Sequence, residues 1–229
     1  ILDGDIKVAL ATMRTLPTPQ IGTSIDGELL VFEAEDADLV LVADEDGAAL
    51  LELHSLQHMQ TEKCIDGTLG LSCWRAAATP ALCFVPATTD TIFMRGAVLV
   101  SGMLLGIAEA TLERSLNYAR QREQFGRPIG SFQSIKHYCA EMAVRCESVR
   151  ALLYHASITL QAQTAAGLFD TFSLKALASD AAQRNANTAV QIHGGMGYTQ
   201  EMDIHLFVKR SQVLGTLFGS ERYHLRKLL

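Results

Sequence analysis

A guanidinium, an aromatic ring and a glycine lie close together in the segment from Arg122 to Gly126, which reads Arg-Glu-Gln-Phe-Gly. A helical pattern precedes the segment and Pro128 follows it, so we expect it where a helix ends and the chain reverses. Because a planar guanidinium can donate two parallel hydrogen bonds to phosphate oxygens, such a corner suits a pyrophosphate. An arginine in a surface ion pair beside a phenylalanine in the core is the alternative.

The segment from Gln191 to Gly197, further along the chain, contains three glycines. Glycine adopts positive φ angles and lets a ligand approach the backbone closely, and the side-chain amide of Gln191 both donates and accepts hydrogen bonds. The same cluster would also serve as an ordinary helix stop. Since no strand precedes it, it is not a dinucleotide-binding fingerprint of the Rossmann type.

Long amphipathic helices are expected to position both segments. Apolar residues recur every three or four positions in two series: Leu105, Ala108, Leu112, Leu116 and Ala119, then Phe132, Ile135, Cys139, Met142, Cys146 and Val149. A third helix is predicted over residues 168–192, where Asp180 and Arg184 are spaced to pair across one turn. Short helices are expected over residues 204–213 and from Ser220, whose hydroxyl suits an N-cap.

Residues 6–86 have a different period. Short apolar runs, separated by turn residues such as Asp26-Gly27 and Asp46-Gly47, predict strands. The expected strands are residues 7–11, 28–34, 38–43, 48–53 and 81–85. The sequence therefore predicts an α+β protein, with a small antiparallel β domain over residues 1–90 and an antiparallel four-helix bundle over residues 91–229.

Composition and charge narrow the classes of function. The net charge is -6, with 19 basic and 25 acidic side chains and no lysine and arginine block, so nucleic acid is not an expected partner. Apolar runs such as residues 96–108 are interpreted as too short and too glycine-rich to span a membrane, and no leader opens the chain, so we expect a cytoplasmic protein. The five cysteines and seven histidines lack metal-ligand spacing. No metal site is expected, and the cysteines should be reduced and mostly buried.

The two segments, with their surroundings, resemble one family. The run from Tyr118 to Ile129, then Phe132-Gln133, then Gln191 to Gly197 is similar in content, order and spacing to the C-terminal helical domain of acyl-CoA dehydrogenases. These are flavoenzymes that desaturate thioesters between Cα and Cβ. The resemblance covers roughly residues 92–229.

The β region resembles the family's middle domain less well. The flavin-contacting strand pair of the family has no clear counterpart between Thr23 and Val42, and Trp74 lies elsewhere. We therefore expect a degenerate flavin-ring pocket on this side. The family's N-terminal helical domain has no match in the chain, so we expect either a fragment or earlier residues that are not represented.

The resemblance implies a set of nucleotide contacts. In the family, the equivalent residues hold the ADP half of an FAD whose flavin ring rests mainly in the neighbouring protomer. The implied contacts are Arg122, Phe125, Gln191, Gly194 and Gly195, with Gln124, Gln133 and Ser220 as weaker candidates. The implied cofactor is FAD shared with a partner subunit, the substrate is an acyl-CoA thioester, and the electron acceptor is electron-transferring flavoprotein or oxygen.

The same resemblance also marks the positions at which the family carries its catalytic glutamate. Counting forward from Gln191, the position at which most of the family carries its catalytic glutamate is Phe218, and the alternative position on the first long helix is Gly96. Neither residue can take the Cα proton, a role worth on the order of 10²–10⁴ in rate. We therefore expect no catalytic residue here and a glutamate-bearing partner in an α₂β₂ assembly. The first members of the family to compare with this chain are those that act on bulky sterol side-chain thioesters.

Two alternatives stay open. One is a self-sufficient homo-oligomeric dehydrogenase with a relocated base, for which Glu221 is the candidate. The other is a flavin-free structural or regulatory protein that keeps the bundle for assembly. Flavin absorbance of the chain, with and without a partner, would separate all three hypotheses.

Overall fold

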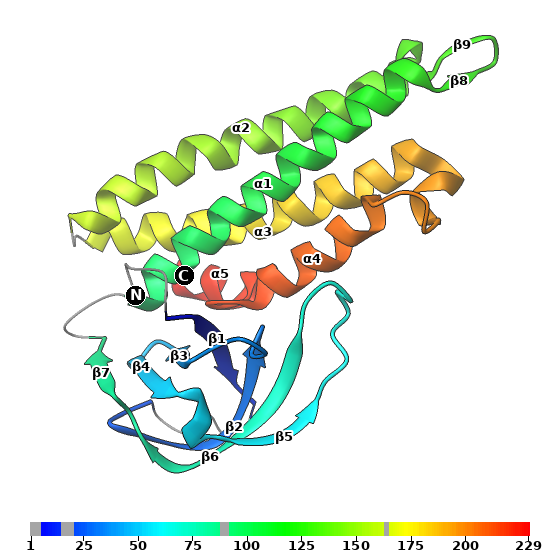
Figure 1. The fold of residues 1–229 in the computed structure, drawn as a ribbon. Coiled ribbons are helices and arrows are strands. Elements are labelled where there is room, and N and C mark those ends of the chain that lie inside the picture. The colour runs from blue at the N-terminus through cyan, green and yellow to red at the C-terminus, as the bar shows by residue number, and fades with distance from the viewer. Residues whose placement is uncertain (1–5, 15–20, 88–91, 163–164) are drawn as a thin grey trace. The chain divides into compact units, whose positions relative to one another are not determined.

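Strands and helices occupy separate parts of the chain, as the change in apolar period predicts (Figure 1). The computed structural model describes residues 6–14, 21–87, 92–162 and 165–229. The chain divides into two units, residues 1–95 and 96–229, and the predicted boundary at residue 90 lies slightly earlier. A β unit followed by a helical unit is the predicted α+β architecture.

Within its described residues, the β unit is built on one sheet of seven strands. These are β1 (Val8–Met13), β2 (Ser24–Phe32), β3 (Leu39–Ala43), β4 (Gly47–Glu52), β5 (Gln57–Thr61), β6 (Leu71–Pro80) and β7 (Cys83–Pro86), in the order β5-β6-β2-β1-β3-β4-β7. The prediction of a purely antiparallel sheet is wrong, because β1 and β3 pair in parallel with Val8 opposite Leu39. The chain passes from β2 to the far side of β1 before β3 begins, which gives β3 the direction of β1.

Alternation along the strands buries one face of the sheet. Val31, Val40, Val42 and Leu51 are fully buried in one apolar cluster. The turn predicted at Asp46-Gly47 joins β3 to β4, where the Asp44 carboxylate accepts hydrogen bonds from both backbone N–H groups (2.8 and 3.2 Å). The turn predicted at Asp26-Gly27 is wrong. Both residues lie inside β2, at a register shift against β6.

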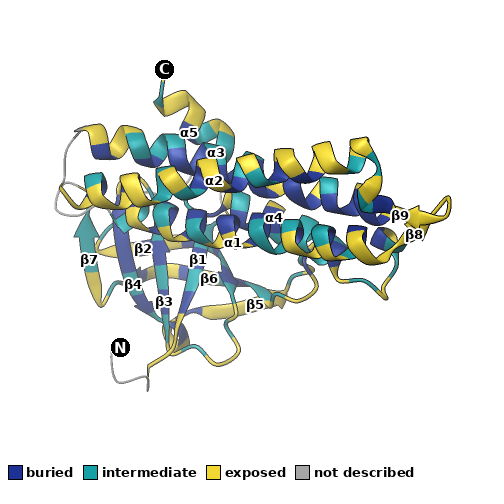
Figure 2. Cartoon of the chain, turned by 90° about the horizontal axis from the view of Figure 1, so that it is seen from above, coloured by how far each residue is buried: buried dark blue, intermediate teal, exposed yellow. Residues whose placement is uncertain are grey.

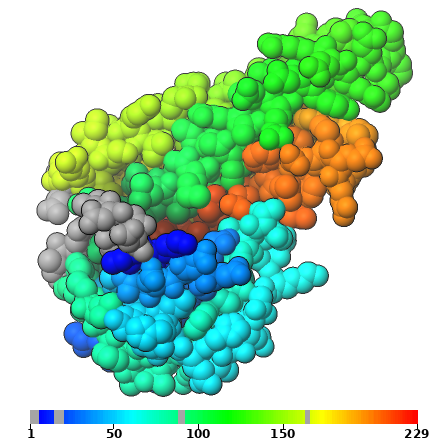
Figure 3. Space-filling model, viewed as in Figure 1, coloured from blue at the N-terminus to red at the C-terminus, as the bar shows by residue number. Residues whose placement is uncertain are grey.

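The described part of the helical unit contains five helices. They are α1 (Ile92–Gln121), α2 (Gln133–Gln161), α3 (Ala165–His193), α4 (Ile204–Thr216) and α5 (Glu221–Lys227). Between α1 and α2 the chain forms a small hairpin of β8 (Glu123–Gln124) and β9 (Arg127–Pro128), followed by the 3₁₀ turn η2 (Ile129–Ser131). The 3₁₀ turn η3 (Gly194–Tyr198) follows α3. The hairpin lies at one end of the helical unit, in green in the space-filling view (Figure 3).

Stretches of buried residues run along the long helices (Figure 2). Asn185 on α3 is completely buried and donates hydrogen bonds to the carbonyl oxygens of Ala108 on α1 (3.2 Å) and Met142 on α2 (3.1 Å). Its amide therefore ties three helices together, and because each of these groups is buried, losing one bond would leave an unsatisfied partner.

The long helix α1 contains one stretch long and apolar enough to cross a membrane by length and composition. This corrects the interpretation from the sequence that its apolar run is too short, because the helix extends from Ile92 to Gln121. Half of that stretch is buried inside the protein, as is usual for a core helix of a bundle.

Candidate functional site

A cavity of about 400 Å³ lies where α1, the β8–β9 hairpin and the α3–η3 junction meet. Its lining residues are Tyr118, Arg122, Gln124, Ile129, Ile192, His193, Gly194, Gly195 and Met196. The two segments that the sequence analysis singled out thus both line one cavity. None of these lining side chains is acidic.

Arg122 is held by its backbone and leaves its side chain available. Its N–H donates to the Tyr118 carbonyl oxygen and its own carbonyl accepts from the N–H of Ile129, both at 2.8 Å. The exposed guanidinium makes no hydrogen bond or ion pair within the part of the chain that the structure describes. The surface ion pair considered from the sequence is therefore not formed among these residues.

The glycines of the second segment have different roles. Gly194 has a φ of +60°, and a Cβ built on Gly194 or Gly195 would meet no atom within 4 Å. A ligand could therefore approach the backbone of both residues closely. Gly197 is structural, because its Cβ would lie 2.9 Å from the Val190 carbonyl oxygen.

Tyr118 and His193 form an aromatic wall that the sequence analysis did not assign to the site. Their rings stack with centroids 4.2 Å apart, and the His193 Nδ1 lies 2.7 Å from the Ala189 carbonyl oxygen. Burial lowers the pKa of His193, which favours the neutral ring. Tyr118 could have been found from its spacing, since it lies four residues before Arg122 on the same helix.

Four of the predicted contacts do not line this cavity. Phe125 is 91% exposed at the tip of the hairpin, with a φ of +54° and its ring edge-on to Phe132 at 6.0 Å. Gln133 lies against His137 (Nε2 to Nε2, 3.2 Å), and Gln191 is exposed. Ser220 is the N-cap of α5 and accepts a hydrogen bond from the Tyr223 N–H at 3.3 Å.

The cavity fits the phosphate end of a nucleotide. A free guanidinium and accessible backbone face it, no carboxylate opposes an anion, and a stacked aromatic pair provides an apolar wall. The donor set is that expected for the ADP part of a dinucleotide.

The turn between α4 and α5 holds Phe218. The residue has a φ of +52°, which is unusual for phenylalanine, and Gly219 follows with a φ of +93°. The carbonyl oxygen of Phe218 lies 2.8 Å from the Nε2 of His224, and the Lys175 ammonium donates to the carbonyl oxygens of Gly215 and Gly219, both at 3.0 Å. The backbone of the turn is therefore fixed by two buried side chains, neither of which the sequence analysis singled out.

The Phe218 ring packs directly against Gly96 of α1. A Cβ built on Gly96 would lie well under 3.0 Å from three ring carbons, a separation that real Cβ atoms essentially never show. The two positions that the resemblance marks for a catalytic glutamate are thus neighbours. Neither holds a carboxylate.

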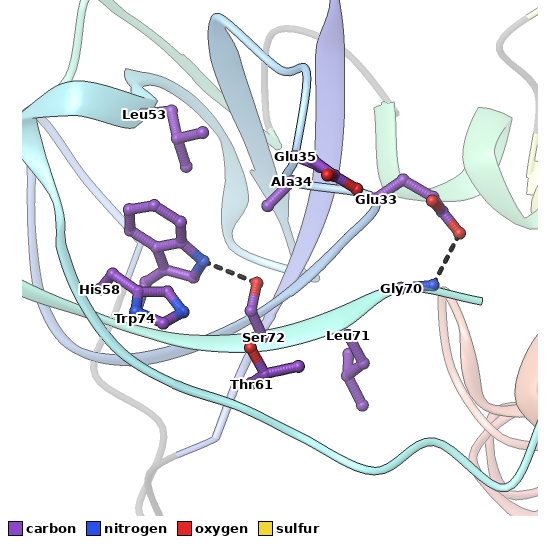
Figure 4. A pocket seen from close by; sticks show the side chains of 10 residues that line it. All are labelled: Glu33, Ala34, Glu35, Leu53, His58, Thr61, Gly70, Leu71, Ser72 and Trp74. Atoms are coloured by element: carbon purple, nitrogen blue, oxygen red, sulfur yellow. Dashed lines mark hydrogen bonds between the residues drawn. The ribbon is translucent and has the colours of Figure 1, made fainter. Parts of the chain in front are cut away.

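A second pocket, of about 520 Å³, lies in the β unit (Figure 4). Trp74 donates from its indole Nε1 to the Ser72 hydroxyl at 2.7 Å, and His58 lies edge-on to it with centroids 5.0 Å apart. Glu33 and Glu35 also line the pocket, and none of its lining residues is lysine or arginine. Two carboxylates without a basic partner make this pocket unsuitable for phosphate.

Residues 86–229 match the family described as "Acyl-CoA dehydrogenase, C-terminal domain". The chain belongs to the acyl-CoA dehydrogenase family. Acyl-CoA dehydrogenase IpdE2 of Mycolicibacterium smegmatis is 34% identical over 91% of this chain and 63% of its own length. The Mycobacterium tuberculosis protein of the same name is 34% identical over 86% of this chain and 58% of its own length. The chain thus spans about three fifths of the length of these curated relatives.

Solved structures of acyl-CoA dehydrogenases share the fold. Butyryl-CoA dehydrogenase from Megasphaera elsdenii superposes with a TM-score of 0.74 at 26% identity, over 96% of this chain and 62% of that one. A putative acyl-CoA dehydrogenase from Mycobacterium smegmatis gives a TM-score of 0.81 at 19% identity, over 99% and 68%. The predicted α+β fold of the family is confirmed, and the family is one of FAD-dependent oxidoreductases.

Proposed function

We propose that this chain is the FAD-site-completing, non-base subunit of a heteromeric, cytoplasmic acyl-CoA dehydrogenase that desaturates an acyl-CoA thioester. The observation that carries the proposal is the contact between Phe218 and Gly96. The sequence marked the two positions by separate counts, and they adjoin in the fold with no carboxylate at either. In the proposed complex, a glutamate of the partner subunit takes the Cα proton.

The surroundings of Glu221 argue against a relocated base in this chain. Glu221 begins α5, and the pKa of Arg184 is raised first by its hydrogen bond with Asp180 and also by the charge of Glu221. Glu221 is therefore within electrostatic reach of a guanidinium. Its carboxylate also lies in the first turn of α5, where the helix dipole favours an acidic side chain, so its presence requires no catalytic role.

The cavity beside Arg122 supports the role in FAD binding. Arg122 would hold the pyrophosphate through paired hydrogen bonds, while the open backbone at Gly194 and Gly195 would admit it closely. Tyr118 and the neutral His193 would exclude water from one side. The bound flavin supplies the hydride acceptor for Cβ.

The exposed hairpin supports a site shared between subunits. Phe125 is 91% exposed at the tip of the hairpin, although a phenyl ring in water is costly. A neighbouring subunit or its flavin nucleotide would cover this ring. The carboxylate-lined pocket of the β unit fits the same interpretation, because its lining does not suit phosphate.

The substrate that we propose is a bulky thioester, such as one with a sterol side chain, and the proposed electron acceptor is electron-transferring flavoprotein. A solved steroid acyl-CoA dehydrogenase, described as the Tcur3481-Tcur3483 G363A variant, has the same fold (TM-score 0.80, 21% identity). That likeness concerns fold, so the acyl group must be identified by assay.

Flavin content and turnover test the proposal. The chain would be purified alone and after co-expression with the acyl-CoA dehydrogenase encoded nearest to it. We expect FAD and thioester-dependent dye reduction in the co-purified complex and no turnover by the chain alone. Full activity of the chain alone would contradict the proposed role, and a complex without flavin would contradict both the role and the site.

A further inference from the structure

The space beside Gly96 is filled by the Phe218 ring from within the same unit. The absent Cβ of Gly96 lets the ring approach the α1 backbone, and the ring itself is half-buried. No carboxylate or hydroxyl group stands at either position. The place where a base and the acyl Cα would meet in a base-bearing relative is therefore occupied by an apolar ring.

Two buried side chains hold this ring in place, and we call them the Lys175–His224 clamp. The Lys175 ammonium is completely buried, and its three N–H groups have three acceptors: the carbonyl oxygens of Gly215 and Gly219 at 3.0 Å and the Ser179 hydroxyl at 3.4 Å. The Gly215 carbonyl lies at the C-terminal end of α4, where the helix dipole favours a cation, and the Gly219 carbonyl lies in the turn that follows.

The clamp is costly to the fold. Lys175 is buried without an ion-pair partner among the described residues, and the Nδ1 of His224 is buried without a hydrogen-bond partner. Phe218 itself has a left-handed backbone, which is strained for a residue other than glycine. Strain of this kind persists where the surrounding structure fixes it, and an ordinary helix connection would require none of these features.

We infer that Phe218 is a plug that closes this subunit to acyl thioesters, and that the Lys175–His224 clamp positions it. The inference rests on the proposed non-base role and adds that the thioester binds in the complex at the partner's site alone. Lys175 and His224 are positioning residues, since His224 contacts the Phe218 carbonyl oxygen and Lys175 binds carbonyl oxygens on either side of it, at Gly215 and Gly219.

A double-mutant cycle in the full-length chain tests the contact. Gly96→Ala should lower the thermal midpoint by roughly 5 °C or more, because the new methyl group overlaps the ring. The same change in a Phe218→Ala background should cost little. Gly106→Ala is the matched control on α1, since its Cβ would meet no atom within 4 Å and alanine should not destabilise the helix. If the effects of Gly96→Ala and Phe218→Ala on the thermal midpoint are additive, the two residues do not interact and the inferred contact is wrong.

Binding stoichiometry tests whether acyl thioesters are excluded from this subunit. The assembled complex would be titrated by calorimetry with a thioether analogue of an acyl-CoA, which cannot be desaturated. We expect one analogue per heterodimer, and a second, weaker equivalent when Phe218 is replaced by alanine, or by leucine if the alanine variant does not assemble. Two equivalents in the unsubstituted complex, or no second equivalent in either variant, would overturn the plug.

The two proposals fail in different ways. If the non-base role is wrong, either the chain will turn over substrate without a partner or its complex will hold no flavin, whatever the analogue stoichiometry. If the plug alone is wrong, the complex will still depend on the partner's glutamate while binding two analogues. Lys175→Met gives a further readout: loss of the clamp should shift the ¹⁹F resonance of 4-fluorophenylalanine placed at position 218, and an unchanged resonance would remove Lys175 from the positioning role.

Discussion

Arg122 is the residue on which nucleotide binding is expected to depend most. Its guanidinium faces the cavity without a partner among the described residues, so a phosphate would gain its hydrogen bonds without breaking others. Arg122→Ala should weaken FAD binding by roughly 1.5–3 kcal/mol, the usual worth of a hydrogen bond to a charged group. Flavin fluorescence released on dilution of the assembled complex measures this. Arg120→Ala, two residues earlier in α1 and outside the cavity, is the control and should retain FAD.

His224 should make the fold sensitive to mild acid. Burial lowers the pKa of His224 to about 4, below the 6.5 of an exposed histidine. Between these values the unfolded chain binds a proton that the folded chain does not, so the free energy of unfolding falls as the pH drops. From pH 7 to pH 5 this one group should remove roughly 2 kcal/mol.

Urea unfolding of the wild type and of His224→Gln at both pH values isolates this contribution. The glutamine variant should be less stable at pH 7, because it replaces the histidine bond to Phe218, yet it should lose about 2 kcal/mol less on acidification. Equal losses in the two proteins would show that His224 does not titrate in this range.

At the scale of elements, the helices could be predicted and part of the sheet could not. In residues 105–119 and 132–149, apolar side chains keep a helical period over many turns. The helical structure of these residues could therefore be predicted from the local sequence. Strand β5 is exposed at every residue and β6 contains an alanine run, so neither shows the alternation that predicts a strand. The parallel pairing of β1 with β3 depends on the path of the chain from β2 to the far side of β1. A short stretch of sequence does not reveal that path.

The candidate site divides in the same way. Arg122, Gln124, Gly194 and Gly195 lie in recognisable segments, and they line one cavity. The clamp could not be predicted, because Lys175 reaches carbonyl groups 40 and 44 residues away and is isolated in its own sequence context. A lone lysine in a helical pattern usually indicates a solvated face.

The N-cap of α5 offers a test at the scale of one element. Ser220 accepts a hydrogen bond from the Tyr223 N–H, as the sequence predicts. Ser220→Ala should lower the free energy of unfolding by about 1 kcal/mol, and Ser220→Asp should restore most of it. If instead flavin retention falls while stability is unchanged, Ser220 contacts the nucleotide and its capping role is negligible.

At the scale of the whole molecule, exposed apolar side chains predict assembly. Leu99 and Met103, four residues apart on α1, are 72% and 52% exposed, and α2 carries exposed Tyr154 and Ile158. On the last helix Leu225 is also exposed. Apolar patches of this kind mark interfaces, so we expect α1 and α5 to bury them against another subunit.

Sedimentation of the double variant Leu99→Lys, Met103→Lys tests this expectation. The wild type should be oligomeric at micromolar concentration, and the variant should associate at least tenfold more weakly, since buried charges are costly at an interface. Ile65→Lys, an exposed apolar residue of the β unit, is the control and should leave assembly unchanged. A monomeric wild type would contradict the account.

The division of labour between two subunits is the central claim, and exchanging carboxylates in the assembled complex tests it most directly. We predict one FAD per heterodimer, loss of turnover with flavin still bound when the partner's glutamate is removed, and little gain from Phe218→Glu in this chain. Glutamate at position 218 should add little because we expect the flavin-ring pocket on this side to be degenerate. One FAD for every subunit, with turnover that survives loss of the partner's glutamate, would contradict the account.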